Sequence, residues 1–156
     1  MKHAALKLTG AAALALLFAT GASAQEKKIK KSDLPAAVQK TADEQSKGAT
    51  VKGYNSEVED GKLQYEVELT VNGHSKDVSI SPAGAVLEVE EEVALGSLPS
   101  DVRAGLQTKA GAGKIAKVES LTKQGKLVAY EAQVRTNGKK SEVQVGPDGK
   151  ALAHPE

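Results

Sequence analysis

Carboxylate side chains recur at alternate positions in two stretches of the first half of the chain. Glu66 and Glu68 form the first set, and Glu88, Glu90 and Glu92 form the second. Alternate residues of a strand share one face, so each set would present its oxygens together. Hard cations such as Ca²⁺ prefer oxygen ligands of this kind. These five residues are therefore cation-binding candidates, and the alternative is that they are solvated charges that protect a sheet from aggregation.

Residues suited to nucleophilic catalysis are scarce. The chain has no Cys, and its last 132 residues contain only two His, His74 and His154. A Ser nucleophile needs a nearby base, and no Gly-x-Ser-x-Gly motif is present to expose one. Two distant His without Cys do not make a zinc site either. The sequence therefore predicts a protein that is not an enzyme, with no catalytic residues and no cofactor.

The first carboxylate pair lies in a segment that predicts a strand and a tight turn. Over residues 61–73, Tyr65 and other apolar residues alternate with polar ones, and Asn72-Gly73 suits a type I′ turn. A second copy runs over residues 125–138, with Tyr130 at the matching position and Asn-Gly at its end. We expect Tyr65 and Tyr130 to face equivalent cores.

The surroundings of this segment are repeated as well. Leu34-Pro35 and Leu98-Pro99 each precede a weakly amphipathic stretch and indicate a helix start. Further turn signals follow each helix. The sequence therefore predicts an α+β fold of two tandem repeats, residues 32–93 and 96–156, each with one helix packed on a four-stranded antiparallel meander.

The first residues are typical of a secretory leader. Lys2 and Lys7 precede an apolar run, and Ala22-Ser23-Ala24 resembles a cleavage site. We expect residues 1–24 to be a signal peptide and residues 25–31 to be a flexible mature N-terminus. This places the protein in the periplasm or outside the cell, with no membrane span after cleavage.

Charge is divided unevenly between the expected repeats. Residues 32–93 hold 5 basic and 13 acidic side chains, whereas residues 96–156 hold 10 and 6. The asymmetry could simply dock one repeat on the other. It could instead serve a protein partner on the solvated strand faces, with Glu66, Glu68, Glu131 and Arg135 as binding candidates. Nucleic acid is not expected, because aromatic stacking platforms are missing.

The repeated motifs, in this order, resemble the PepSY-like family, also described as β-lactamase-inhibitor-protein-like. The shared motifs are Leu-Pro-x-x-Val, Gly-Lys…Tyr-Glu, Asn-Gly and Gly-x-x-Leu, and they span nearly all of residues 34–152. The resemblance implies a helix packed on an antiparallel sheet, secretion, and a non-enzymatic role in binding or inhibiting secreted enzymes, especially peptidases.

Together these observations predict a non-enzymatic secreted or periplasmic binding module. Its expected partner is a protein, such as an envelope peptidase. The alternative is a cation-binding envelope stress protein that uses the acidic first repeat.

Overall fold

The computed structural model describes residues 26–59 and 61–156. The expected signal peptide over residues 1–24 lies outside these ranges. Within them, no helix combines the length and the apolar character that crossing a bilayer requires.

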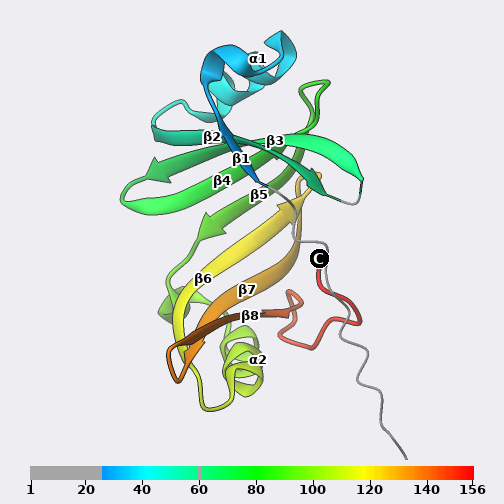
Figure 1. Ribbon diagram of the computed structural model, residues 1–156. Coiled ribbons are helices and arrows are strands. Elements are labelled where there is room, and N and C mark those ends of the chain that lie inside the picture. The colour runs from blue at the N-terminus through cyan, green and yellow to red at the C-terminus, as the bar shows by residue number, and fades with distance from the viewer. Residues whose placement is uncertain (1–25, 60) are drawn as a thin grey trace, which may run out of the picture.

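In the described residues, eight strands form one antiparallel sheet in which each strand pairs with the next along the chain (Figure 1). This order needs only short connections. From β1 to β8, the strands are Lys27–Ile29, Thr50–Glu59, Lys62–Val71, His74–Ile80, Val86–Glu92, Lys114–Lys123, Lys126–Thr136 and Lys139–Val145.

The sheet differs from the two four-stranded meanders that we expected. β5 pairs with β6, so both halves share one sheet. The second half contributes three strands and an isolated bridge between Val145 and Ala151. The expected fourth strand of this half does not form. Pro155 lies in that segment and has no N–H group to donate to a neighbouring strand.

A second difference concerns the expected flexible segment 25–31. Its residues Lys27–Ile29 form β1, and Lys28 lies opposite Asn55 of β2. Ile29 packs against the apolar core of the first half, which explains why this polar segment is held on the sheet.

The two Asn-Gly turns form as predicted. Asn72 and Asn137 both have φ of 51°, and Gly73 and Gly138 follow with φ of 88° and 81°. Two successive positive φ angles define the type I′ turn, which matches the twist of the flanking strands. The turns fix the register of β3 with β4 and of β7 with β8.

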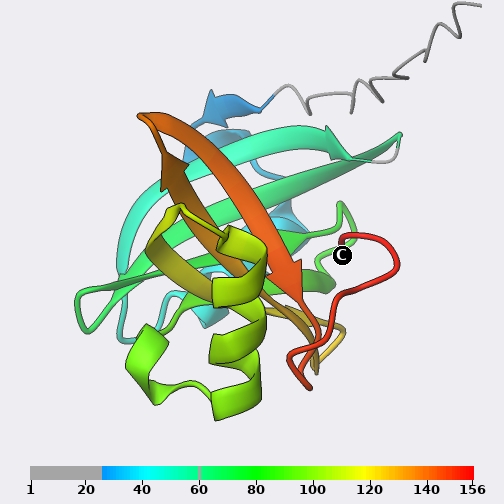
Figure 2. The same cartoon turned by 90° about the horizontal axis from the view of Figure 1, so that it is seen from below.

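One helix packs on each half of the sheet, and Figure 1 shows the two helices at opposite ends of the molecule. α1 spans Ala36–Gln45 and α2 spans Ser100–Ala110; each follows a Pro and a short 3₁₀ turn, Lys31–Asp33 or Leu95–Ser97. Figure 2, seen from below, shows α2 in front of the sheet. α2 ends at Gly111, whose φ of 57° is a conformation that glycine adopts readily.

The core is divided into two apolar clusters, one beneath each helix. The first consists of Leu34, Val38, Ala42, Val67, Leu69, Val78 and Ile80, and the second of Leu98, Val102, Leu106, Val118, Ala132, Val134 and Val145. Tyr65 and Tyr130 pack at the border of their clusters, opposite Ile80 and Val145. The two tyrosines therefore occupy equivalent environments, as predicted.

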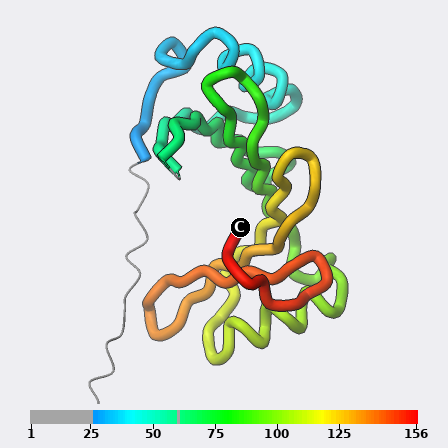
Figure 3. The backbone as a smooth tube through the Cα atoms, turned by 90° about the vertical axis from the view of Figure 1, so that its right-hand side faces the viewer, coloured from blue at the N-terminus to red at the C-terminus, as the bar shows by residue number. Residues whose placement is uncertain are grey.

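The backbone curves around an opening, and both helices lie on the outside of the curve (Figure 3). Because side chains alternate between the two faces of each strand, the apolar residues lie beneath the helices and the polar residues turn into the curve.

Candidate functional site

The face of the sheet opposite the helices is formed by polar side chains. In β3, Val67 and Leu69 are buried in the core, so Glu66 and Glu68 point to the other side. The register continues this pattern across the sheet, with Glu68 opposite Asp77 and Asp77 opposite Glu90. Side chains that are far apart in the sequence therefore meet on one surface.

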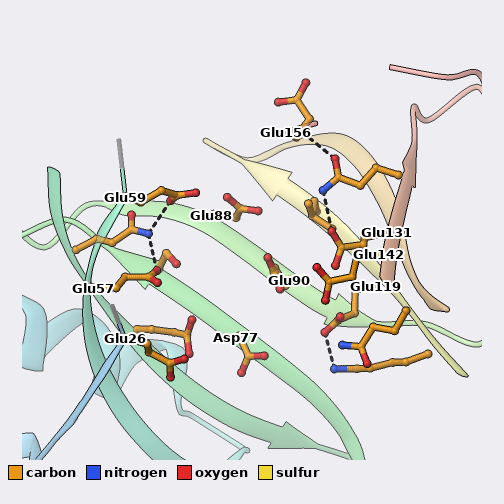
Figure 4. A pocket seen from close by; sticks show the side chains of 17 residues that line it. Glu26, Glu57, Glu59, Asp77, Glu88, Glu90, Glu119, Glu131, Glu142 and Glu156 are labelled. Carbon is orange, nitrogen blue, oxygen red and sulfur yellow. Dashed lines mark hydrogen bonds and ion pairs between the residues drawn. The ribbon is translucent and has the colours of Figure 1, made fainter. Parts of the chain in front are cut away.

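This surface encloses a cavity of about 470 Å³ that is lined by seventeen residues. Eleven of them are acidic, whereas Lys117 is the only basic residue and Leu121 the only aliphatic one. We call this lining the acidic face. Its carboxylates are Glu26, Glu57, Glu59, Glu66, Asp77, Glu88, Glu90, Glu119, Glu131, Glu142 and Glu156. Figure 4 labels all of them except Glu66 and shows that they come from several parts of the chain.

Burial among like charges makes several of these carboxyl groups hard to ionise. Burial raises the pKa of Glu90 to about 8, and Glu119 and Glu88 add to the effect. Burial also raises the pKa of Glu66 to about 7 and that of Asp77 to about 6. The pKa values of Glu88 and Glu131 move upward for the same reason. Burial, with a smaller contribution from mutual repulsion, therefore disfavours the charged forms of these carboxyls, and a cationic ligand would favour them.

Amide donors relieve part of this repulsion within the face. Asn55 Nδ2 donates to Glu66 Oε1 at 3.2 Å and to Glu68 Oε1 at 3.0 Å. Gln64 Nε2 donates to Glu57 and Glu59, both at 2.7 Å.

Lysines provide direct compensation in other places. Lys117 Nζ lies 2.6 Å from Glu119 Oε1, and Glu119 is only 4% exposed. Lys123 Nζ lies 3.6 Å from Glu88 Oε2 and 3.9 Å from Glu156 Oε2. Both lysines belong to β6, so this compensation comes from the second half of the sheet.

The five cation candidates do not form one site. Glu66 and Glu68 come together with Glu26, and each residue of this group offers an oxygen within 4.8 Å of the others. Glu90 belongs to a second such group. Glu92 accepts a hydrogen bond from the backbone N–H of Ser75 at 3.1 Å, which lowers its pKa.

The protein-binding candidates are also divided. Glu66 and Glu131 line the cavity, and Glu131 accepts a hydrogen bond from Gln144 at 2.8 Å. Arg135, near the end of β7, is exposed and is not part of the lining.

Sequence reasoning missed four residues of the two carboxylate groups and their surroundings: Glu26, Asn55, Asp77 and Glu119. Asp77 could have been found, because alternation in a strand that buries Val78 and Ile80 places Asp77 on the opposite face. Glu26 was hidden in a segment expected to be flexible. Asn55 and Glu119 each come shortly after a β-bulge within their own strand. The bulge adds a residue and so interrupts the alternation of apolar and polar positions.

No model of a known protein family matches the sequence, and no curated protein matches it. Three solved structures from Bacteroides are similar in fold. A protein of B. eggerthii described as presumed periplasmic has a TM-score of 0.61 and 17% identity, covering 76% of this chain and 86% of its own. A BLIP-like protein of B. fragilis has a TM-score of 0.57 and 20% identity, with coverage of 76% and 83%.

A DUF2874 family protein of B. ovatus has a TM-score of 0.60 and 20% identity, covering 76% of this chain and 84% of its own. Identities at this level establish a shared architecture and leave the chemistry of the site to be argued from its residues. The chain therefore has the α+β fold seen in BLIP-like proteins.

Proposed function

We propose that this protein is a non-enzymatic periplasmic or secreted binding module whose acidic face docks a positively charged segment of another protein. One observation supports the proposal above all: eleven carboxylates converge on a concave surface that has a single lysine in its lining. Lysine or arginine side chains of a partner would supply the missing positive charge and would steer the encounter.

The composition of the lining favours a cationic segment over a small organic ligand. Small-molecule sites are mostly apolar, with a few polar groups that fix orientation. Here Leu121 is the only aliphatic residue among the seventeen, and none is aromatic. Affinity would then come from charge and from the shape of the curved sheet, so it would be sensitive to salt.

The pKa pattern favours binding over catalysis. General acid–base chemistry usually relies on two groups whose pKa values are pushed apart. In this cavity, burial raises the pKa of Glu66, Asp77 and Glu90 in the same direction. Such a pattern supports a surface that binds a positively charged ligand rather than a catalytic acid–base pair.

We propose a periplasmic or secreted location from two observations that agree. The leader-like residues 1–24 predict secretion, and a neighbour in fold is described as presumed periplasmic. The PepSY-like resemblance and a role against an envelope peptidase are compatible with a fold shared with a BLIP-like protein.

We also propose that the two halves arose by duplication. Tyr54 pairs with Val67 in the first half, and Val118 pairs with Ala132 in the second, at offsets of 64 and 65 residues. β2 and β6 carry a bulge at the same relative position, after Val51 and after Ile115.

A defined cationic probe tests the docking proposal. We expect residues 25–156 to bind decalysine, measured by isothermal titration calorimetry at low salt, with an affinity that falls steeply as salt increases. At pH 8.5, where most of the Glu90 carboxyl groups are ionised, the variant Glu90→Gln/Glu131→Gln should bind about three- to tenfold more weakly, since each exposed or half-buried charge contributes about 0.2–1 kcal/mol.

The matched control is Glu44→Gln/Asp101→Asn, which removes the same charge from the outer helices. It should leave the affinity within about twofold of the wild type, because both residues lie outside the cavity. Absence of decalysine binding at low salt, or equal weakening in both variants, would refute docking on the acidic face. If decalysine binds as expected, a natural partner can be sought among basic periplasmic proteins, with the same variants as controls.

A further inference from the structure

We propose that the outer edge of β8 binds an extended segment of another protein, which adds a strand to the sheet antiparallel to β8. The partner that fits this edge carries a basic, an apolar and a basic side chain in succession. The proposal concerns the edge of the sheet, goes beyond docking on the acidic face, and does not depend on it.

β8 stands at the end of the sheet, where its counterpart in the first half has a neighbour (Figure 1). β4 and β8 each follow an Asn-Gly turn, and β4 lies between β3 and β5. β8 pairs with β7 and, within the described residues, with no strand on its other side. Such an edge presents unpaired N–H and C=O groups, which are a template for a strand from another chain.

The second half begins the hairpin that joins β4 to β5 and then leaves it. Val145 pairs with Ala151, just as Ile80 pairs with Val86 at the equivalent place in the first half. In the first half the pairing continues along β4. In the second half it stops after this single bridge. The place beside β8 is therefore the place that β5 fills beside β4.

The side chains of β8 show what the missing strand would cover. Val78 of β4 is 0% exposed, whereas its counterpart Val143 is only half-buried on the side of α2. Asp77 of β4 is half-buried, whereas its counterpart Glu142 is exposed. Both differences have one cause, because β5 covers β4 and no strand of the described chain covers β8.

A cavity of about 490 Å³ lies against this edge and reaches both faces of the sheet. Its lining includes Val143 and Lys109 on the side of α2, and Glu131 and Glu142 on the concave side. Leu152 adds apolar surface. The edge therefore has room for a strand whose side chains alternate between the two faces.

The hairpin of β7 and β8 determines which backbone groups would bond the partner. The residues that flank a two-residue turn exchange hydrogen bonds, so the odd-numbered residues of β8, from Lys139 onward, bond to β7. The even-numbered residues Glu142 and Gln144 therefore direct their N–H and C=O groups outward. Gly146 follows the same rule, because its N–H donates outward to the carbonyl oxygen of Lys150 at 2.8 Å.

The surroundings of the edge specify the side chains of the partner. The partner residue opposite Val143 lies on the side of α2 and should be apolar, as Val89 is opposite Val78 in the first half. The partner residues on either side of it turn to the concave face, beside Glu131 and Glu142. Opposite charges on neighbouring strands stabilise a sheet, so these two residues should be basic. A run such as Lys-Val-Lys meets all three conditions.

Charge favours this partner over a second copy of the chain. If two β8 edges paired with each other, Glu131 and Glu142 of one copy would approach the same residues of the other. Like charges on neighbouring strands destabilise a sheet. A basic strand from a different protein has no such cost.

The first test titrates ¹⁵N-labelled residues 25–156 with the capped peptide Thr-Lys-Val-Lys-Thr at millimolar concentrations. The backbone amides of Glu142 and Gln144 should shift and exchange more slowly with solvent, because they lie at the new pairing. The amide of Asp77, which is inside the pairing of β4 with β5, should stay unchanged. An unchanged Glu142 amide would overturn the proposal.

A modified peptide separates strand addition from attraction by charge. N-methyl groups on the backbone nitrogens of both lysines keep the positive charges but remove the two N–H groups that face β8. This peptide should bind about tenfold more weakly or worse, because two hydrogen bonds are lost. Equal affinity for the two peptides would overturn strand addition.

A variant pair makes the same comparison in the protein. Glu142→Pro removes an outward N–H and leaves the pairing of β7 with β8 intact, since proline is tolerated at an edge where its nitrogen faces solvent. Glu142→Gln loses the same charge and keeps the N–H. The Pro variant should bind the unmodified peptide about three- to tenfold more weakly than the Gln variant. Equal binding would contradict the proposal.

Sedimentation of the wild type tests the alternative occupant. We expect a monomer without the peptide. A dimer that Glu142→Pro dissociates would place a second copy on this edge and would overturn the choice of partner.

The two proposals fail separately. Glu142→Pro removes one of the eleven carboxylates of the acidic face, so its affinity for decalysine should stay within about twofold of the wild type. If decalysine does not bind and the two peptides still differ, docking on the acidic face fails alone. If decalysine binds as expected and the two peptides bind equally, strand addition fails alone.

Discussion

The two halves of the sheet share one backbone plan but balance their buried carboxylates differently. At the bulge of β6, Lys117 supplies an ammonium to Glu119. At the matching bulge of β2, Gly53 supplies only space, and Asn55 donates hydrogen bonds to two carboxylates. At this position the second half thus provides a positive charge of its own, whereas the first half provides a neutral amide donor.

The apolar cores differ in a complementary way. α1 contributes Ala42 to its cluster, whereas α2 contributes Leu106 at the corresponding turn. The strands compensate: Leu69 of the first half corresponds to Val134 of the second, and Val67 corresponds to Ala132. Large side chains come from the strands in one half and from the helix in the other, so the larger helix residue partly offsets the smaller strand residues.

The largest predicted effect breaks this exchange of volume. Leu106→Ala should destabilise the protein by about 2–5 kcal/mol, because the small strand residues Ala132 and Val134 cannot refill the space. Urea denaturation followed by circular dichroism measures the loss. Adding Ala132→Val should recover part of it. A loss below about 1 kcal/mol would show that the second core is loosely packed and that the comparison of the cores is wrong.

The second largest effect is expected from removing the Lys117 ammonium group. Lys117→Met should destabilise by about 2–4 kcal/mol, because Glu119 is left nearly buried without its partner, although the Lys117 side chain is itself 24% exposed. Lys114→Met, on the same strand and exposed, should change little. The double variant Lys117→Met/Glu119→Gln should regain most of the stability. No difference between the two lysine variants would contradict an electrostatic role for Lys117.

Sequence reasoning could predict the local frame of each half but not how the halves meet. Alternation placed Tyr65 and Tyr130 correctly, and Asn-Gly fixed two turns, because both signals depend on neighbours along the chain. The pairing of β5 with β6 depends on contacts across the whole molecule. The role of Asn55 was hidden because a lone amide carries no motif, and its meaning comes from two carboxylates brought to it by register.

The third prediction concerns pH. The folded-state pKa values of Glu66, Asp77 and Glu90 are about 7, 6 and 8, above the ordinary values of 4.5 and 3.8. The folded state therefore binds more protons than the unfolded state between about pH 4 and 8, so stability should fall as pH rises through this window. Glu92, whose pKa is lowered, gains its stabilising effect below this window and adds no slope within it.

Thermal unfolding between pH 5 and 8.5 measures this slope. We expect a higher Tm at pH 5 than at pH 8.5, a smaller difference in Glu90→Gln, and an unchanged difference in Glu44→Gln. Since these carboxyls line the proposed docking surface, bound decalysine should flatten the slope. A Tm that rises steadily with pH would contradict the pKa pattern of the acidic face.

The smallest predicted effect tests whether the two backbones are equivalent beneath these differences. Asn72→Ala and Asn137→Ala each place a Cβ-bearing residue without a polar side chain at φ of 51°, which should cost about 1 kcal/mol. Asn→Gly at either turn should be close to neutral, because glycine adopts this conformation without strain. Chemical denaturation measures all four variants. Equal losses would mean that each hairpin contributes alike and that the halves diverged only in side chains. A loss at one turn alone would mean that the register of the other hairpin is set by contacts outside its turn, so the two hairpins would not be equivalent.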